Sequence, residues 1–591
     1  MIFGKHMNRY YIRFGWLLLA GVLTLLIEDR LIVIIPNMYQ MVINGINDGM
    51  VVRDGVEYLF TMDFLIGKIC LPMSGIIVAM LLGRFLWRML FFTSAIRMET
   101  DLRNRMFARA KELDCQFYGV NKVGNLMSLF TNDLDTVQEC FGWGIVMFVD
   151  AFLMGSIAVI EMLKMDKLLT GLAMIPMGLL MAVATVLGKH MTKKWDERQE
   201  AFSRLSDFSQ ESFSGIAVIK AFVKEAVELM SFKKLNVENE EANVAHTKAA
   251  VLLRILTTLF VESVIGIILG YGGYLVYAGK FNAGQLVEFI GYFNLTIFPI
   301  MAISELIDMT SRGKASLDRI GAFLDAEPNV KNSMEAQAME MIRGQIEFRN
   351  LTFRYPGAEY DVLKNVSFTI EAGQSVGIVG KTGSGKTTVA DLLLRTYNVP
   401  DGTVFIDGRD INTIKIKDLR AGCAYVPQDN FLFSDTIANN IAFGMEDVEN
   451  VPQAAVLADV DENIRAFAKG YDTILGERGV TVSGGQKQRI SIARALMRRA
   501  PILILDDAVS AVDTATEKTI LENLQNVRGG KTTLLTAHRI STVDRMDKIL
   551  FFDDGALVAA GSHEELLESC PAYAKMVQLQ ALDAEGGEYN G

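Results

Sequence analysis

The sequence predicts a helical membrane domain followed by an α/β domain, and two observations support this division. Segments of about 20 mostly apolar residues, long enough to cross a bilayer as helices, occur only within the first 310 residues. From about residue 340, short β-rich runs alternate with amphipathic helices and glycine-rich turns. The expected parts are a transmembrane domain at 1–310, a linker at 311–341, an α/β domain at 342–580 and a C-terminal tail at 581–591.

The transmembrane domain is expected to contain six helices and two long cytoplasmic loops. The six apolar segments are 14–35, 64–92, 141–163, 168–188, 251–278 and 284–310. The stretches 93–139 and 189–250 are long, rich in lysine and arginine, and free of proline. Because basic residues stay on the cytoplasmic side, we expect these stretches, both termini and the α/β domain to face the cytoplasm of a multi-pass protein of the cell membrane. The stretches themselves are expected to continue the spans as helices.

Composition excludes several other classes of protein. Half of the 591 residues are hydrophobic and 21% are charged, against about 25% in an average soluble protein. The formal net charge of −11 argues against nucleic acid as a partner, because such proteins carry a basic stripe. The five cysteines are scattered and form no C-x-x-C, so neither a disulfide framework nor a zinc site is expected.

A phosphate-binding loop is the clearest chemical motif. The short apolar strand 376–379 is followed by G-x-x-x-x-G-K-T at 380–387 and then by an expected helix at 388–395. Backbone N–H groups of such a loop point at phosphates, with Lys386 against the β- and γ-phosphates and the Thr387 hydroxyl on Mg²⁺. The phosphate-binding residues are expected to be Gly380, Lys381, Thr382, Gly383, Ser384, Gly385, Lys386, Thr387 and Thr388.

Two further motifs belong with this loop. The apolar strand 502–505 ends in Asp506, which is placed to hold Mg²⁺, and Asp507 follows where a base would meet the attacking water. A second anion-binding turn, Ser483, Gly484, Gly485 and Gln486, opens a helix expected to run to about Arg499. Ser483 stands at the N-cap position, and the glycines leave N–H groups uncovered at the positive end of the helix dipole. A simple helix cap is the alternative interpretation of this turn.

With these motifs in this order, the chain resembles an ATP-binding cassette (ABC) transporter, specifically an exporter half-transporter, over nearly its whole length. The resemblance implies the ABC exporter fold with a P-loop NTPase nucleotide-binding domain, and ATP and Mg²⁺ as cofactors. It also implies a head-to-tail dimer, in which each ATP lies between the phosphate loop of one chain and the signature turn of the other. Fusion of membrane and ATPase parts in one chain favours export over import.

The resemblance assigns roles to further residues. Tyr355 matches the aromatic residue that stacks on adenine, with packing on its own strand as the alternative. Gln428 matches the glutamine whose side chain reaches Mg²⁺, and His538 matches the switch histidine that contacts the γ-phosphate. The segment 510–513 matches the loop that crosses to the partner chain. Segments 117–128 and 211–222 resemble the cytoplasmic loops whose short helices dock on the ATPase domains.

One position departs from the family pattern. Active members carry glutamate after the magnesium aspartate, whereas this chain carries Asp507, whose carboxylate is withdrawn by about 1.5 Å, one carbon–carbon bond. General-base catalysis needs a hydrogen bond of about 2.6–3.2 Å to the water, so the site on this chain's own phosphate loop is expected to be weak. The combination resembles the degenerate-site subunit of a heterodimeric multidrug exporter. A homodimer with slow ATPase, and a nucleotide-gated channel or regulator, are the alternatives.

The cargo is expected to be a small hydrophobic or amphipathic molecule, and membrane lipid is an expected partner, but the sequence does not identify the substrate. Glu28, Asp29 and Arg30 fall within the first apolar segment. Ionisable groups in a bilayer are costly and often functional, so these residues either attract cationic cargo or pair structurally. Both interpretations remain open.

Overall fold

The computed structural model describes residues 3–53, 56–445, 448–476, 479 and 481–588 of the chain. The chain divides into two compact units. The first, the membrane unit, contains the residues up to Lys111 together with Val123–Ala326. The second, the nucleotide-binding unit, contains Glu112–Lys122 and the residues from Glu327 onward. The division at Ala326 lies inside the expected linker 311–341.

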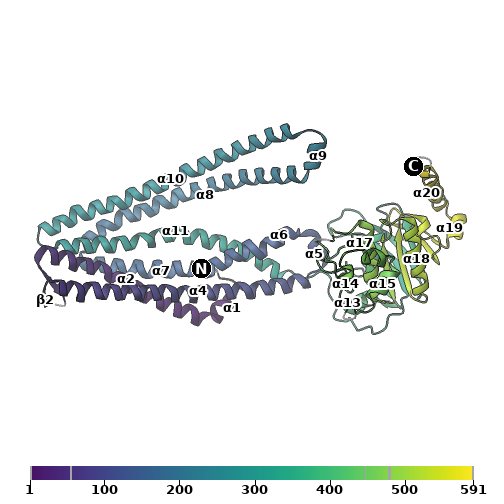
Figure 1. Cartoon of the computed structure of the whole chain (residues 1–591), viewed down its shortest axis with the longest axis horizontal. Helices are drawn as coiled ribbons and strands as arrows, with labels where there is room; N and C mark the ends of the chain where they lie inside the picture. The colour runs from purple at the N-terminus through teal and green to yellow at the C-terminus, as the bar shows by residue number, and fades with distance from the viewer. Residues whose placement is uncertain (1–2, 54–55, 446–447, 477–478, 480, 589–591) are drawn as a thin grey trace. The chain divides into compact units, whose positions relative to one another are not determined.

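Long helices make up the membrane unit (Figure 1). Its main helices are α1 (Asn8–Arg13), α2 (Gly15–Asp48), α4 (Leu71–Glu112), α7 (Leu134–Met165), α8 (Lys167–Ser214), α10 (Glu225–Tyr277) and α11 (Ala283–Asp325). Among the described residues, five helical stretches are long and apolar enough to cross a membrane: Met62–Glu112, Val123–Met165, Lys167–Ser214, Glu225–Tyr277 and Ala283–Asp325. The predicted membrane-helical fold is therefore present.

Helix α2 is the element expected to supply the sixth span, which stays a prediction. It is 34 residues long but carries three charged residues at 28–30 near its middle. It does not end at Pro36, as the segment 14–35 suggests, but continues to Asp48. The proline ring is accommodated because α11 presents Gly291 there: a Cβ on that glycine would lie 2.8 Å from the Pro36 Cβ.

The expected loop 36–63 contains structure that the sequence pattern did not reveal. After α2, β1 (Met50–Arg53) and β2 (Val56–Leu59) form an antiparallel hairpin, followed by α3 (Met62–Phe64) and a π-helical turn at Leu65–Cys70. The hairpin is held to the helices because Val51 is buried with Phe64 and Ile69. Strands of four residues are too short for a period of two to stand out in the sequence.

The stretches 93–139 and 189–250 are helical, as predicted. Helix α4 continues to Glu112, and α6 (Val123–Ser128) and a π-helical turn (Leu129–Asp133) lead into α7. Helices α8 and α10 run side by side as a long pair, joined by α9 (Ile216–Ala221) (Figure 1). At 1.5 Å per residue, the 53 residues of α10 extend about 80 Å, far more than the hydrocarbon core of a bilayer.

The nucleotide-binding unit is built on two sheets. The larger has the strand order β12-β11-β5-β10-β9-β8, in which only β12 is antiparallel to its neighbour. The smaller is antiparallel with the order β4-β3-β6-β7. The strands are β3 (Ile346–Phe353), β4 (Leu363–Ile370), β5 (Ser375–Gly380), β6 (Val404–Ile406), β7 (Arg409–Asp410), β8 (Cys423–Val426), β9 (Ile502–Asp506), β10 (Thr532–Ala537), β11 (Lys548–Asp553) and β12 (Ala556–Gly561).

Both faces of the larger sheet are covered, which explains its apolar strands. Every residue of β9 and β10 is buried, the pattern of a parallel sheet between two layers. The helices of this unit are α5 (Cys115–Val120), α12 (Lys386–Leu393), α13 (Ile416–Ala421), α14 (Ile437–Ile441), α15 (Val451–Leu457), α16 (Asp461–Arg465), α17 (Gly484–Met497), α18 (Thr514–Val527), α19 (His563–Ser569) and α20 (Pro571–Glu588).

The ends of this unit differ from the expected boundaries. Helix α11 continues to Asp325, so the first half of the expected linker is helical. Helix α20 continues through the expected tail to Glu588, and 589–591 lie outside the described residues. Helix α5, between α4 and α6, belongs to the nucleotide-binding unit. Asp114 caps α5 by accepting from the Phe117 N–H at 3.0 Å, and its other oxygen accepts from the Val330 N–H at 2.9 Å.

Candidate functional site

The sheet brings four of the predicted motifs to one edge. The phosphate loop follows β5, His538 follows β10, Asp507 follows β9 and Gln428 follows β8. These strands are parallel and in register, with Val379 opposite Ala537 and Leu505 opposite Val426. The carboxyl ends of parallel strands are the usual ligand-binding edge of an α/β sheet.

The glycines of the phosphate loop are required by its packing. Gly385 has a φ of +94°, and a Cβ there would lie 2.6 Å from Leu363 Cδ2. A Cβ on Gly380 would lie 2.2 Å from the Phe552 carbonyl oxygen. Residues with side chains therefore cannot replace these glycines without moving the neighbouring strands. The loop delivers the chain into α12, which begins at Lys386 rather than at the expected 388.

Lys386 is held at the centre of the loop. Its Nζ donates to the carbonyl oxygens of Gly380 at 2.8 Å and Lys381 at 3.0 Å. Burial lowers the pKa of this ammonium, while the carboxylates of Asp507 and Asp506 act in the opposite direction. The side chain is thus a buried cation inside a ring of backbone groups, which is suited to a polyphosphate.

Three hydroxyl and carboxyl groups connect the loop to the central strands. Thr387 Oγ1 donates to Asp506 Oδ1 at 3.1 Å, and Thr536 Oγ1 donates to the same oxygen at 2.6 Å. The Thr536 hydroxyl in turn accepts from the Asp507 N–H at 2.9 Å. Burial raises the pKa of Asp506. Thr536 was not among the predicted site residues, although its position two residues before the switch histidine placed it at this edge.

The residues present fit a magnesium nucleotide. Asp506 Oδ2 and Ser384 Oγ are buried and have no hydrogen-bond partner in the described part of the chain. Buried polar atoms are nearly always satisfied in native proteins. A divalent cation beside Asp506 and a phosphate oxygen beside Ser384 would satisfy both, and oxygen ligands such as Asp506 and Thr387 are those that Mg²⁺ prefers.

Tyr355 packs on its own domain in this structure. Its ring lies edge-on to those of Phe353 and Tyr397, with centroids 5.1 and 4.9 Å away, and a 3.0 Å hydrogen bond joins its hydroxyl to Thr388 Oγ1. Burial raises its pKa to about 12. Only the contact with Phe353 of β3 matches the alternative that the sequence left open, because Tyr397 and Thr388 lie outside that strand. Stacking on adenine stays a prediction.

The signature turn is a helix cap with an exposed outer side. Ser483 Oγ accepts from the Gln486 N–H at 3.2 Å, and Gln486 Oε1 accepts from the Ser483 N–H at 3.0 Å. The predicted N-cap is therefore confirmed, and α17 runs from Gly484 to Met497. Ser483 and Gly484 are both exposed, and a Cβ on Gly484 would meet no described atom within 4 Å.

A buried glutamine links the signature helix to the end of β9. Gln488 Nε2 donates to the Asp507 carbonyl oxygen at 3.0 Å, and its Oε1 accepts from the Ala511 N–H at 2.9 Å. The loop 510–513 then ends in Asp513, which caps α18. Gln488 was not among the predicted site residues. The sequence around Gln488 gives little indication of this role, because a single glutamine in a polar helix turn resembles a surface residue.

The two remaining predicted residues differ in how they are held. Gln428 is exposed and makes no hydrogen bond to Thr387 or Asp506 in the described part of the chain. The backbone around His538 is fixed by Gln580 of α20: Gln580 Nε2 donates to the His538 carbonyl oxygen at 2.8 Å, and its Oε1 accepts from the Ile540 N–H at 2.9 Å. Gln580 lies 42 residues from His538 along the chain, and no local pattern could have predicted this contact.

Comparison with known proteins identifies the family. Residues 18–300 match the model of the ABC transporter transmembrane region, and 363–510 match that of the ABC transporter domain. The chain is 35% identical over 587 residues to the probable multidrug resistance ABC transporter ATP-binding/permease protein YheI of Bacillus subtilis, covering 98% of each chain. The chain belongs to the ABC transporter family.

Other ABC exporters extend this result. The multidrug resistance-like ATP-binding protein MdlA of Escherichia coli is 32% identical over 581 residues, with 97% of this chain and 96% of MdlA covered. The ATP-dependent lipid A-core flippase of Syntrophus aciditrophicus is 34% identical over 502 residues, with 84% and 82% covered. A bacterial Atm1-family ABC exporter with ATP bound has a TM-score of 0.77 at 26% identity, covering 97% of this chain and 98% of the exporter.

Family membership establishes the general activity. The chain is a multi-pass membrane protein of the exporter-type half-transporter architecture, with its nucleotide-binding unit at the C-terminal end. It binds ATP and couples ATP hydrolysis to transport, and ABC exporters of this architecture act as dimers.

Proposed function

We propose that this chain is the degenerate-site subunit of a heterodimeric exporter that moves a hydrophobic or amphipathic molecule out of the cell. The names of YheI and MdlA support a multidrug substrate class, and the flippase relative acts on a lipid. The basic stretches 93–139 and 189–250 support an orientation with both termini and the nucleotide-binding unit in the cytoplasm.

The asymmetry rests on one observation: the chain carries Asp507 beside a phosphate loop and a signature turn that are otherwise complete. The backbone N–H of Asp507 is fixed by Thr536 and its carbonyl by Gln488, so the main chain cannot slide forward to replace the missing methylene. A carboxylate withdrawn by about 1.5 Å loses its hydrogen bond to the water, and general-base catalysis of this kind contributes about 10²–10⁴-fold. The nucleotide on this chain's own loop is therefore held but hydrolysed slowly.

The other residues have distinct tasks in this proposal. Lys386 and the amides of the phosphate loop bind and orient the phosphates. Thr387 and Asp506 hold Mg²⁺, with Gln428 joining them, and the ion supplies charge neutralisation at the phosphates. His538 contacts the terminal phosphate, and Tyr355 holds adenine.

The signature turn serves the second site. Ser483 and Gly484 are exposed on this chain and Gly485 is partly exposed, so the turn is available to the nucleotide of a partner. A partner with glutamate after its magnesium aspartate would place an effective base at that site. One competent site per dimer then drives transport.

The deciding experiment compares the ATPase activity of three purified proteins: the chain alone, Asp507→Glu alone, and the chain co-expressed with a half-transporter that carries the glutamate. We expect little activity in the first two, because the lone chain does not form the productive pair, and robust activity in the third. Strong activation of the lone chain by Asp507→Glu would instead indicate a homodimer with slow sites. Nucleotide-dependent ion conductance by the lone chain in planar bilayers would indicate a channel.

A further inference from the structure

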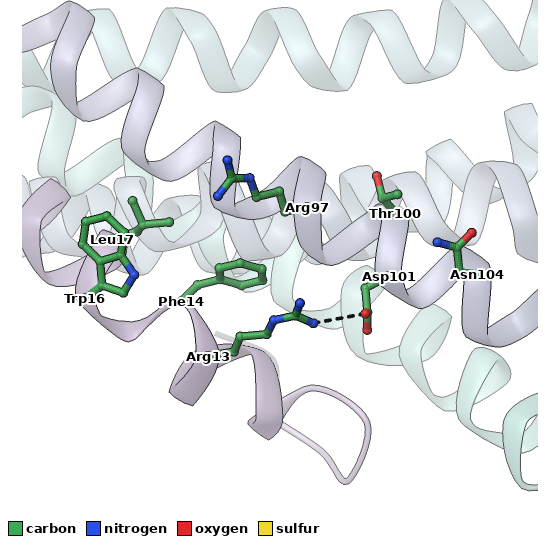
Figure 2. Close-up of a pocket in the computed structure, with 8 residues that line it drawn as sticks. All are labelled: Arg13, Phe14, Trp16, Leu17, Arg97, Thr100, Asp101 and Asn104. Carbon is green, nitrogen blue, oxygen red and sulfur yellow. Dashed lines mark hydrogen bonds and ion pairs between the residues drawn. The ribbon is translucent and has the colours of Figure 1, made fainter.

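A pocket of about 540 Å³ opens in the membrane unit where α1 and the start of α2 meet α4 (Figure 2). One wall comes from the α1–α2 junction and the other from a stretch of about two turns of α4. The lining residues are Arg13, Phe14, Trp16, Leu17, Arg97, Thr100, Asp101 and Asn104. None of these residues belongs to the nucleotide site.

The pocket carries an excess of positive charge. Arg13 is paired with Asp101 at 3.1 Å, the contact drawn in Figure 2. Asp101 also accepts from the Tyr10 hydroxyl at 2.6 Å and from Arg9 at 3.4 Å, so its charge is already compensated. Arg97 is exposed and has no ion-pair partner among the described residues. An anion is therefore the missing counter-charge, whereas a ligand with a free ammonium would find no available carboxylate.

An apolar stripe begins at the same pocket. Trp16, Leu19, Leu23 and Ile27 are exposed by 69%, 62%, 53% and 62%, and their spacing of three and four residues places them on one face of α2. Because α2 is the expected first span, this face is suited to lipid chains. Tryptophan at the start of such a stripe and arginine just beyond it are the residues that anchor helices at the headgroup level.

We propose that this pocket binds the headgroup phosphate of an anionic phospholipid. Arg97 and Arg13 hold the phosphate, Asn104 supplies a further donor, and Trp16 lies at the glycerol level. The acyl chains follow the stripe along α2. Basic pockets between membrane helices on the cytoplasmic side are a recognised means of binding anionic headgroups. None of the lining residues belongs to the ATP site.

The test uses the whole protein in phosphatidylcholine nanodiscs with increasing fractions of phosphatidylglycerol. Three proteins are compared: the wild type, Arg97→Gln and the control Arg103→Gln. Arg103 lies on the same helix and is exposed, but it is paired with Glu99 and does not line the pocket. Phosphatidylglycerol binding is measured by native mass spectrometry and by the shift in melting temperature (Tm) that the lipid causes.

We expect the apparent affinity for phosphatidylglycerol to fall about fivefold in Arg97→Gln, since one basic residue near an anionic surface contributes about 1 kcal/mol. Arg103→Gln should bind like the wild type, and all three should have the same Tm in pure phosphatidylcholine. An equal loss in both variants, or no loss in Arg97→Gln, would overturn the site. Soluble glycerol 3-phosphate should have no effect; if it reproduced the Tm shift, the ligand would be a free phosphate and the lipid assignment would be wrong.

Discussion

The phosphate loop and the signature turn are both glycine-rich segments that open a helix, yet they are built differently. In the phosphate loop, Lys386 donates to the loop's own carbonyl groups, and a Cβ on Gly385 would collide with Leu363. In the signature turn, Ser483 and Gly484 are exposed, and a Cβ on Gly484 would meet no described atom within 4 Å.

The difference shows why each glycine is present. A glycine such as Gly385 is explained by its own chain, because nothing larger fits and its φ of +94° favours glycine. Gly484 has no such explanation within the chain, since its surroundings are open and a helix normally prefers alanine. In the proposed dimer, the missing side chain of Gly484 leaves room for the nucleotide of the partner. The two loops should respond to substitution in different ways.

The largest expected effect is on nucleotide binding through the phosphate loop. Lys386→Ala should weaken ATP binding about 10- to 100-fold, because hydrogen bonds to a charged group are worth about 1.5–3 kcal/mol each. The measurement is the affinity for a fluorescent ATP analogue. Lys381→Ala is the matched control, since only the backbone of this residue is expected to meet the phosphates, while its side chain is exposed and its Nζ lies 3.6 Å from Asp553 Oδ1. Equal losses in both variants would show that Lys386 has no special place in the loop.

The next prediction compares a substitution in the signature turn with one at this chain's own ATP site. Both are made in a heterodimer with an active partner. Gly484→Val should lower steady-state ATPase about 10²–10³-fold, because transition-state donors are worth about 2.7–4 kcal/mol each. Asp507→Asn should lower it less than about threefold, because it alters a site whose general base is already out of reach. Both variants should keep the wild-type Tm. If Asp507→Asn abolished turnover and Gly484→Val did not, the asymmetric model would fail.

A smaller effect on ATP binding is expected at Gln580, which holds the backbone on either side of Arg539, next to His538. Gln580→Ala removes two hydrogen bonds beside His538, which contacts the nucleotide on this chain's own phosphate loop in the proposed model. At about 1 kcal/mol per bond, we expect the affinity of the lone chain for a fluorescent ATP analogue to fall about 3- to 10-fold, while the turnover of the pair changes little. Gln580→Glu keeps the acceptor for the Ile540 N–H and should be intermediate. Gln578→Ala, exposed on the same helix, is the control. A parallel fall in Tm and in ATP affinity, or an equal effect of Gln578→Ala, would indicate a structural role only.

The smallest expected effect is on the pH dependence of stability, through Asp391 in the helix that follows the phosphate loop. Burial raises the pKa of Asp391, on α12, from its ordinary value of 3.8 to about 6. The folded state therefore binds this proton more tightly than the unfolded state, and the contribution to stability is lost as pH rises from about 4 to 6. Asp391→Asn should raise the free energy of unfolding by roughly 1–3 kcal/mol at pH 7 and change it little at pH 4.

Thermal unfolding across this pH range checks the prediction. The exposed Asp472→Asn should leave the profile unchanged. A wild-type profile in Asp391→Asn would show that the buried carboxyl does not carry the pH dependence.

The sequence correctly predicted the features that depend on residues adjacent in the chain. The phosphate loop, the acidic strand and the cap at Ser483 each follow from residues adjacent in the chain, and the structure has them within a few residues of the expected bounds. The apolar segments likewise located the membrane helices. The predicted end of α2 at Pro36 was wrong. The helix continues through this proline because Gly291, in a helix some 250 residues away, leaves room for the proline ring.

The contacts that sequence reasoning missed are made by polar residues acting over a distance. Thr536, Gln488 and Gln580 each hold a backbone or carboxyl group of another element. Threonine and glutamine are common in strands and exposed helices, and nothing in their neighbours distinguishes a bridging side chain from a solvated one. Their roles follow from the sheet register and helix packing, which only the three-dimensional structure provides.

The discontinuous nucleotide-binding unit has a practical consequence for protein engineering. One carboxylate, that of Asp114, both caps α5 and accepts from the Val330 N–H. A chimera that exchanges this unit at Ala326 alone would leave Glu112–Lys122 behind and separate the two ends of that interaction. Transplanting the unit intact requires two cuts between α4 and α6 as well as one after α11. The smallest portable module of this ATPase is therefore made of two separate pieces of chain.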